Sequence, residues 1–178
     1  MLNKHIFIVR GVSNSGKTHT IRSIAERLVV RYMGKHKNTK NVVPLKITVD
    51  VLWGTVSAKE LLCIITIECD GKKIVIGICT AGDTVEIIQK KMQELIDTNC
   101  DAIVCGCKGV EDDFDDIYNE IVNIANNYNA HSETTKHTKD EPDDPIDENV
   151  AESILDALCN VIDNEFGFLN GRNTFIHS

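Results

Sequence analysis

The residues from Gly11 to Thr18 (GVSNSGKT) combine glycine, hydroxyl and lysine groups at a spacing suited to holding a phosphate. They fit the pattern G-x-x-x-x-G-K-[ST], in which glycines allow successive backbone N–H groups to curl around an anion. In such a loop the lysine ammonium contacts the β- and γ-phosphates of a nucleotide, and the hydroxyl that follows it ligates Mg²⁺. The sequence therefore predicts a nucleotide-binding loop whose contacts come from Gly11, Val12, Ser13, Asn14, Ser15, Gly16, Lys17, Thr18 and His19.

The segments on either side of this loop are those needed to position it. Residues 5–10 (HIFIVR) form a short apolar run rich in β-branched residues, which predicts a buried strand. After the loop, apolar residues recur at helical spacing, which predicts a helix that begins at Lys17 and ends near Gly34. The N-terminus of this helix would direct unsatisfied N–H groups and the positive end of its dipole at the same phosphate.

A carboxylate that supports the metal is expected at the end of another strand. Asp83 is the first candidate, because it follows the apolar run 73–79 through a glycine. Residues 83–86 (DTVE) also fit a helix N-cap with a reciprocal glutamate, and Asp83 can serve both purposes. The predicted metal ligands are Thr18 and Asp83, with Asp50 and Glu68 as weaker alternatives to Asp83.

Apolar periodicity along the rest of the chain predicts strands alternating with helices. Residues 61–69 and 73–79 are strand-like runs joined at Asp70-Gly71, a strong hairpin signal. The strictly alternating run 45–53 predicts a half-buried strand near a sheet edge. A further strand is expected at 102–107, and helices at 85–96, 114–128 and 149–165. The sequence thus predicts one α/β domain over residues 1–178, with three layers, a mostly parallel sheet with one antiparallel hairpin, and helices on both faces.

Composition narrows the classes of partner. Residues 131–147 have almost no apolar side chains and contain two prolines, which predicts a mobile acidic loop. The net charge of −8 argues against broad binding to nucleic acid or to an anionic membrane. No apolar run reaches the length of a bilayer span and no signal peptide is evident, so a cytoplasmic protein is expected.

The cysteines are numerous but lack the spacing of a metal or disulfide site. Seven are present, an odd number, and no C-x-x-C pair occurs. Most fall in apolar runs, where cysteine behaves as a small hydrophobe. Cys105-Gly106-Cys107 is the candidate for a metal or redox pair, and the interpretation as core residues is favoured over it.

The loop, with its strand and helix, resembles the P-loop NTPase superfamily. The closer likeness is to small bacterial and phage P-loop proteins that pair the loop with a strand followed by Gly-Asp, and it covers about residues 5–125. The resemblance implies the P-loop NTPase fold, Mg²⁺ and ATP as cofactors, and Lys17 as the catalytic residue. The hairpin before Thr80-Ala81-Gly82 is also similar to that of Ras-like GTPases, but Cys79 stands where those carry aspartate. Their guanine-reading Asn-Lys-x-Asp is missing, so ATP is expected rather than GTP.

Two functions remain open at this point. The first is an NTPase or P-loop kinase that hydrolyses the nucleotide or transfers its γ-phosphate to a small or nucleotide-like acceptor. The alternative is a non-catalytic, nucleotide-gated interaction or regulatory protein with an unidentified protein partner. Phosphoryl transfer is commonly assisted by arginine, yet no arginine-bearing lid is evident, and Arg172 is the one late candidate.

Overall fold

The computed structural model describes residues 3–12, 16–37, 45–53, 60–109, 115–137 and 146–168. Within these ranges the chain alternates strands and helices, as the apolar periodicity predicts. Their order is β1 (Lys4–Gly11), α1 (Lys17–Lys37), β2 (Lys46–Trp53), β3 (Leu62–Cys69), β4 (Lys72–Cys79), α2 (Val85–Asp97), β5 (Ala102–Lys108), α3 (Asp115–Asn127), β6 (Ala130–Lys136) and α4 (Glu148–Phe166).

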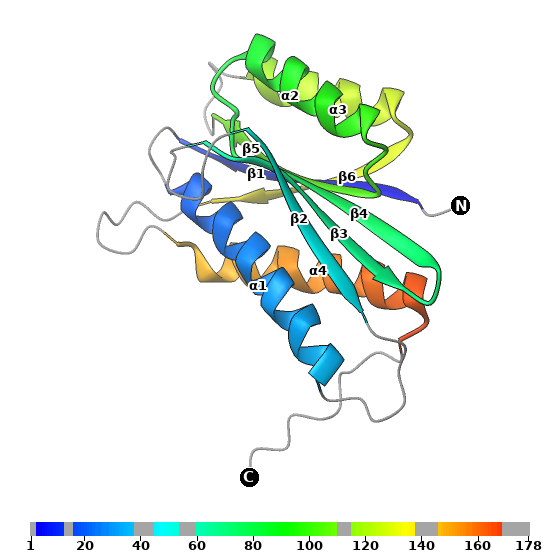
Figure 1. Cartoon of the computed structure of the whole chain (residues 1–178). Helices are drawn as coiled ribbons and strands as arrows, with labels where there is room; N and C mark the ends of the chain where they lie inside the picture. Colours follow the sequence, from blue (N-terminus) through cyan, green and yellow to red (C-terminus); the bar gives the residue numbers. More distant parts are fainter. Residues whose placement is uncertain are drawn as a thin grey trace.

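The strands form one sheet in the order β2-β3-β4-β5-β1-β6 (Figure 1). β1 pairs in parallel with β5 and β6, β4 pairs in parallel with β5, and β3 is antiparallel to both of its neighbours. The hairpin predicted at Asp70-Gly71 is confirmed, because both residues have the positive φ angles, 50° and 73°, that a two-residue type I′ turn requires. The strand predicted near an edge is also confirmed, since β2 ends the sheet.

Helices cover both faces of the sheet, α2 and α3 on one and α1 and α4 on the other (Figure 1). β1 shows how the sequence achieves this. Phe7 and Val9 pack with α1 and α4, whereas Ile6 and Ile8 pack with α2 and α3. A strand buried on both faces needs a continuous apolar run, which is what residues 6–9 supply. The predicted α/β fold, with a mostly parallel sheet covered on both faces, is therefore confirmed at this level.

The end of the first helix differs from the prediction. α1 passes through Gly34 and continues to Lys37. A glycine inside a helix costs only about 1 kcal/mol relative to alanine, so without a proline or another breaker after it, it does not stop the helix. No helix in the described ranges is both long and apolar enough to cross a lipid bilayer.

The predicted loop at 131–147 is wrong in its first part. Residues 130–136 form β6, which pairs in parallel with β1 from Lys4↔Ala130 to Arg10↔Lys136. The strand has few apolar side chains because it lies at the sheet edge and is partly exposed on both faces. Backbone hydrogen bonds to β1 supply the stabilisation that apolar side chains would otherwise supply. Residues 138–145 of the predicted loop lie outside the described residues.

Candidate functional site

The candidate site lies at the carboxyl end of β1, where the connections of the sheet diverge. β1 leads into α1 on one face, whereas the neighbouring β5 leads to α3 on the other. In parallel α/β sheets such a switch point opens a crevice that commonly receives ligands. Backbone hydrogen bonds join the segments here, because Gly109 N donates to Gly11 O and Lys108 N donates to Gly82 O, both at 3.1 Å. The predicted phosphate loop starts at this switch point.

The structure describes both ends of the predicted loop. Gly11 is the last residue of β1 and is buried. Gly16 has a φ of 85°, a conformation that residues with a Cβ rarely adopt. Thr20 N donates to Gly16 O at 3.0 Å, so the first hydrogen bond of α1 is accepted by this glycine. The backbone N–H groups before Thr20 therefore have no acceptor within the helix. The central residues, Ser13, Asn14 and Ser15, lie outside the described residues.

The side chain of Lys17 folds back over the start of the loop. Its Nζ donates to Gly11 O at 2.9 Å and to Val12 O at 2.5 Å. Burial lowers the pKa of Lys17 from its ordinary value, the Asp83 carboxylate opposes this effect, and the Lys108 ammonium adds to it. The ammonium is therefore held at the start of the loop by two weakly basic carbonyls, and a phosphate oxygen would be a stronger acceptor for the same donors.

Asp83 is the carboxylate that the fold brings near Lys17. Its side chain is exposed and lies close enough for its charge to raise the lysine pKa. The helix-cap prediction for Asp83 is wrong by one residue, because Thr84 caps α2 and its side chain accepts from Ile87 N at 3.3 Å. Starting the helix therefore does not occupy the Asp83 carboxylate.

The remaining predicted ligands lie on three different elements, and only those on α1 adjoin the phosphate loop. Thr18 is half-buried in the first turn of α1, and His19 beside it is exposed. Asp50 lies on the edge strand β2, which β3, β4 and β5 separate from β1. Glu68 is near the hairpin end of β3, where it pairs with Lys46 at 3.6 Å. Of the three candidate carboxylates, only Asp83 comes together with the phosphate loop.

Basic residues that the sequence did not single out gather at the same edge of the sheet. Lys108 ends β5 opposite Gly11, and Lys136 ends β6 opposite Arg10. Arg10 donates through Nε to Gly109 O at 2.8 Å, and its guanidinium lies 4.6 Å from the ring centre of Tyr118. The sequence could have indicated them by their positions, because each of these cations lies at or next to the carboxyl end of a strand that runs toward the loop. These charges favour an anionic ligand in a protein that is acidic overall.

A buried polar cluster fixes the start of α1. Thr20 Oγ1 lies 2.9 Å from His137 Nε2 and accepts from Asp147 N at 3.0 Å. His137 N donates to Arg10 O at 2.7 Å, and Asp147 caps α4 by accepting from Val150 N at 3.2 Å. The cluster therefore ties together the ends of β1 and β6 and the N-terminal turns of α1 and α4. Sequence patterns gave no sign of it, because its members are far apart along the chain.

The cysteines of the central strands are packing residues. Cys79 and Cys105 are register partners on β4 and β5, and both are buried free thiols, as is Cys107. Burial raises the pKa of Cys79 to about 12 and the pKa of Cys105 well above its usual value. A thiol with a raised pKa is a poor nucleophile and a poor metal ligand. Within the described residues, no group of three or more His, Cys, Asp or Glu side chains is arranged to hold a metal.

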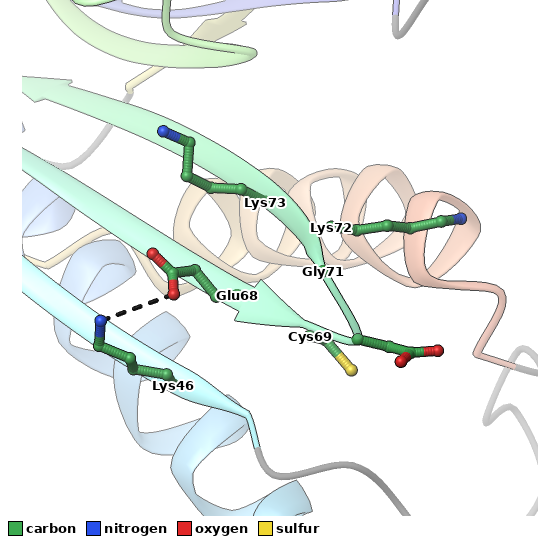
Figure 2. A pocket seen from close by; sticks show the side chains of 7 residues that line it. Lys46, Glu68, Cys69, Gly71, Lys72 and Lys73 are labelled. Carbon is green, nitrogen blue, oxygen red and sulfur yellow. Dashed lines mark ion pairs between the residues drawn. The ribbon is translucent and has the colours of Figure 1, made fainter.

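A hollow of about 410 Å³ lies around the β3–β4 hairpin, at the opposite end of β4 from Asp83 (Figure 2). Three lysines line it, but Figure 2 shows Lys72 and Lys73 pointing away from each other while Lys46 faces Glu68. Lys72 also donates to Glu165 O at 2.8 Å. The basic groups do not converge on one point, so the phosphate loop remains the stronger candidate.

Comparison of the chain with protein-family models, with curated proteins and with solved structures finds no match. The functional interpretation therefore depends on the residues of the site themselves: the two loop glycines, the Lys17 ammonium and the nearby Asp83 carboxylate.

Proposed function

We propose that this chain is a Mg-dependent nucleotide-binding protein of the P-loop NTPase type, which binds ATP and hydrolyses it or transfers its γ-phosphate to a small or nucleotide-like acceptor. The observation that carries the proposal is the Lys17 ammonium, held over the carbonyls of Gly11 and Val12 at the switch point, where the Asp83 charge acts on it. This arrangement offers donors to a phosphate, and the Asp83 carboxylate, whose charge acts on Lys17, is available to a cation.

The residues present fit a Mg-nucleotide. Mg²⁺ is usually held by one or two protein oxygens together with phosphates and water, so the lack of a three-ligand cluster among the described residues does not conflict with it. Thr18 and Asp83 would hold the cation, which when bound would neutralise phosphate charge. Lys17 and the N–H groups at the start of α1 would bind the phosphate oxygens and orient them.

A second candidate, a nucleotide-gated interaction protein, is favoured by the contacts that three of the described arginines make. Arg10 lies against Tyr118, Arg27 makes a bidentate pair with Glu148 at 2.7 Å for both hydrogen bonds, and Arg31 pairs with Asp156 at 3.5 Å. The Arg27 and Arg31 guanidiniums pair with carboxylates of α4, whereas rapid phosphoryl transfer commonly uses one on the γ-phosphate. A partner protein that supplies the arginine would make turnover conditional on binding.

Binding and turnover assays separate the candidates. Calorimetry with ATP and Mg²⁺ tests the nucleotide site itself, and a single site should be filled. Release of labelled phosphate without an acceptor, and transfer of label when nucleosides or nucleotides are added, then identify hydrolysis and transfer. A protein that binds tightly but turns over slowly under all these conditions fits the gated interaction protein. Failure to bind any nucleoside triphosphate would overturn both.

Replacing Asp83 with Asn should leave the apo protein near its original stability, because Thr84 and not Asp83 caps α2. The substitution removes the carboxylate that Mg²⁺ prefers. Melting temperatures should therefore show that the variant loses much of the extra stabilisation that ATP with Mg²⁺ gives over ATP with EDTA. Glu86→Gln is the matched control, since it removes the same charge in the first turn of α2. If the Mg-dependent increment survives in Asp83→Asn, this residue does not serve the metal.

Nucleotide affinity should fall as the pH rises from 7 toward 10. Phosphate binding needs the charged form of Lys17, and burial lowers the pKa of this lysine below its ordinary value of 10.5. The ammonium therefore begins to lose its proton at a lower pH than a solvent-exposed lysine, while a phosphate with a second pKa of about 6 gains little further charge above pH 7. Calorimetric titrations across this range measure how ATP affinity depends on pH, and this dependence should become weaker in Lys17→Met. If the affinity of Lys17→Met falls as steeply with pH, a group other than Lys17 causes the dependence.

A further inference from the structure

Among the described residues, no strand pairs with the outer side of β2. Among the described elements it is the terminal strand beside β3, so every second residue presents backbone N–H and C=O groups outward. The pairing with β3 is regular from Lys46↔Glu68 to Val51↔Cys63, and the register shifts only after that. A strand edge of this length is a template for pairing with another strand.

The α1-facing side of this edge is apolar and exposed. Ile47, Val49 and Val51 are opposite core residues of β3, yet Val49 and Val51 remain 47% and 45% exposed. A groove of about 300 Å³ runs between β2 and α1, lined mainly by apolar side chains, with Arg22 and Glu26 also in its lining, and Val30 in the same lining is 69% exposed. Met33, one turn further along α1, is 52% exposed. Apolar side chains on two adjoining elements form a continuous surface of the kind found at interfaces.

The other side of β2 carries opposite charges at matched positions. Lys46, Thr48 and Asp50 point to the face opposite Val49, because alternate residues of a strand share a face. In an antiparallel pair of two such strands centred on Thr48, Lys46 of each copy lies opposite Asp50 of the other. In the same register Ile47 lies opposite Val49. The sequence KITVD is therefore complementary to itself in charge and in shape.

We propose that this edge is a self-association surface and that its occupant is a second copy of this chain. Two β2 strands pair antiparallel about a two-fold axis at Thr48, which joins the two sheets into one and places both copies of α1 on the same face. Lys46 then lies between its own Glu68, 3.6 Å away, and Asp50 of the other copy (Figure 2). The two grooves face each other across the seam, so the exposed valines are covered.

The charge pattern favours a second copy over an unrelated strand. An unrelated strand would need charges in the reverse order at the same spacing, whereas a second copy provides them by symmetry. The net charge of −8 on each copy opposes association, but at about 150 mM salt this long-range repulsion is screened beyond about 8 Å, while directly opposed pairs keep part of their attraction.

Sedimentation of the full chain at about 150 mM salt tests the proposal, with a dimer as the expected result. Asp50→Lys places two lysines opposite each other at both ends of the seam and should weaken dimerisation about tenfold or more. The triple variant Lys46→Asp, Asp50→Lys and Glu68→Lys reverses both charges across the seam and keeps an opposite charge beside position 46, so it should recover most of the affinity. Thermal melting of each variant checks that the monomer still folds.

Thr48→Cys tests the register directly. The seven native cysteines are buried, so a thiol added at position 48, which is half-buried, is the more accessible one. Under mild oxidation or with a short bifunctional thiol reagent, Thr48→Cys should cross-link two copies, while Glu152→Cys on the exposed side of α4 should not.

A chain that stays monomeric at about 100 μM overturns the proposal, even if it binds another protein through this groove. A dimer that is insensitive to Asp50→Lys and does not cross-link through position 48 also overturns it, because association then uses another surface.

Discussion

Replacing Lys17 with Ala should lower the affinity for Mg-ATP by about tenfold or more. The ammonium is the charged donor of the site, and a hydrogen bond to a charged group contributes about 1.5–3 kcal/mol. In the absence of nucleotide its partners are the carbonyls of Gly11 and Val12. The truncation removes these two hydrogen bonds but also relieves the partial burial of a charge. These effects on the free energy of unfolding oppose each other, so it should change by only about 1 kcal/mol.

Isothermal titration calorimetry with ATP and Mg²⁺ measures the first effect, and urea unfolding without nucleotide measures the second. Lys73→Ala is the matched control, because it removes the same charge from an exposed position near the hairpin (Figure 2). A folded Lys17→Ala protein that binds ATP as tightly as the parent chain would refute the proposed phosphate site. A loss of affinity in Lys73→Ala as well would indicate a general electrostatic effect and not a contact.

The hairpin turn, β1 and the start of α1 could be predicted from the sequence, because residues close together in the chain determine each of them. The hairpin at Asp70-Gly71 needs two consecutive positive φ angles, and that residue pair supplies them at low energy. β1 is a continuous apolar run because it is covered on both faces. The start of α1 at Lys17 follows from a glycine that ends the loop and the helical spacing beyond it.

Features decided by distant neighbours could not be predicted in this way. β6 has the composition of a loop and becomes a strand because β1 offers it a free edge. The contact of Thr20 with His137 joins residues that are 117 positions apart, and no pattern within either segment reveals it. The sequence predicts the cap of α2 at Asp83 and the structure has it at Thr84, because both residue types are good N-caps.

The position of Asp83 depends on the close approach of β4 and β5 just beyond their paired residues. Gly82 O accepts from Lys108 N at 3.1 Å, which joins the chain after β4 to the last residue of β5. A Cβ added at Gly82 would lie 2.7 Å from the carbonyl carbon of Gly106 and closer still to its oxygen. This contact is with backbone, which cannot rotate away as a side chain does. A side chain at residue 82 would therefore push the segment that carries Asp83 away from the loop.

Gly82→Ala should consequently destabilise the fold by about 3 kcal/mol, at the upper end of the range for overpacking. Gly77→Ala on β4 is the matched control, because its added Cβ would meet the methyl groups of Leu95 at 2.9 Å and Cys100 Sγ at 3.1 Å, which are ends of side chains that can shift. Urea unfolding should show a clearly smaller loss for Gly77→Ala. The folded molecules of Gly82→Ala should also gain less ATP affinity from Mg²⁺ than the parent chain does, because Asp83 is displaced. Equal stabilities for the two variants would mean that the strands separate easily at residue 82, and that their close approach does not fix the carboxylate beside Lys17.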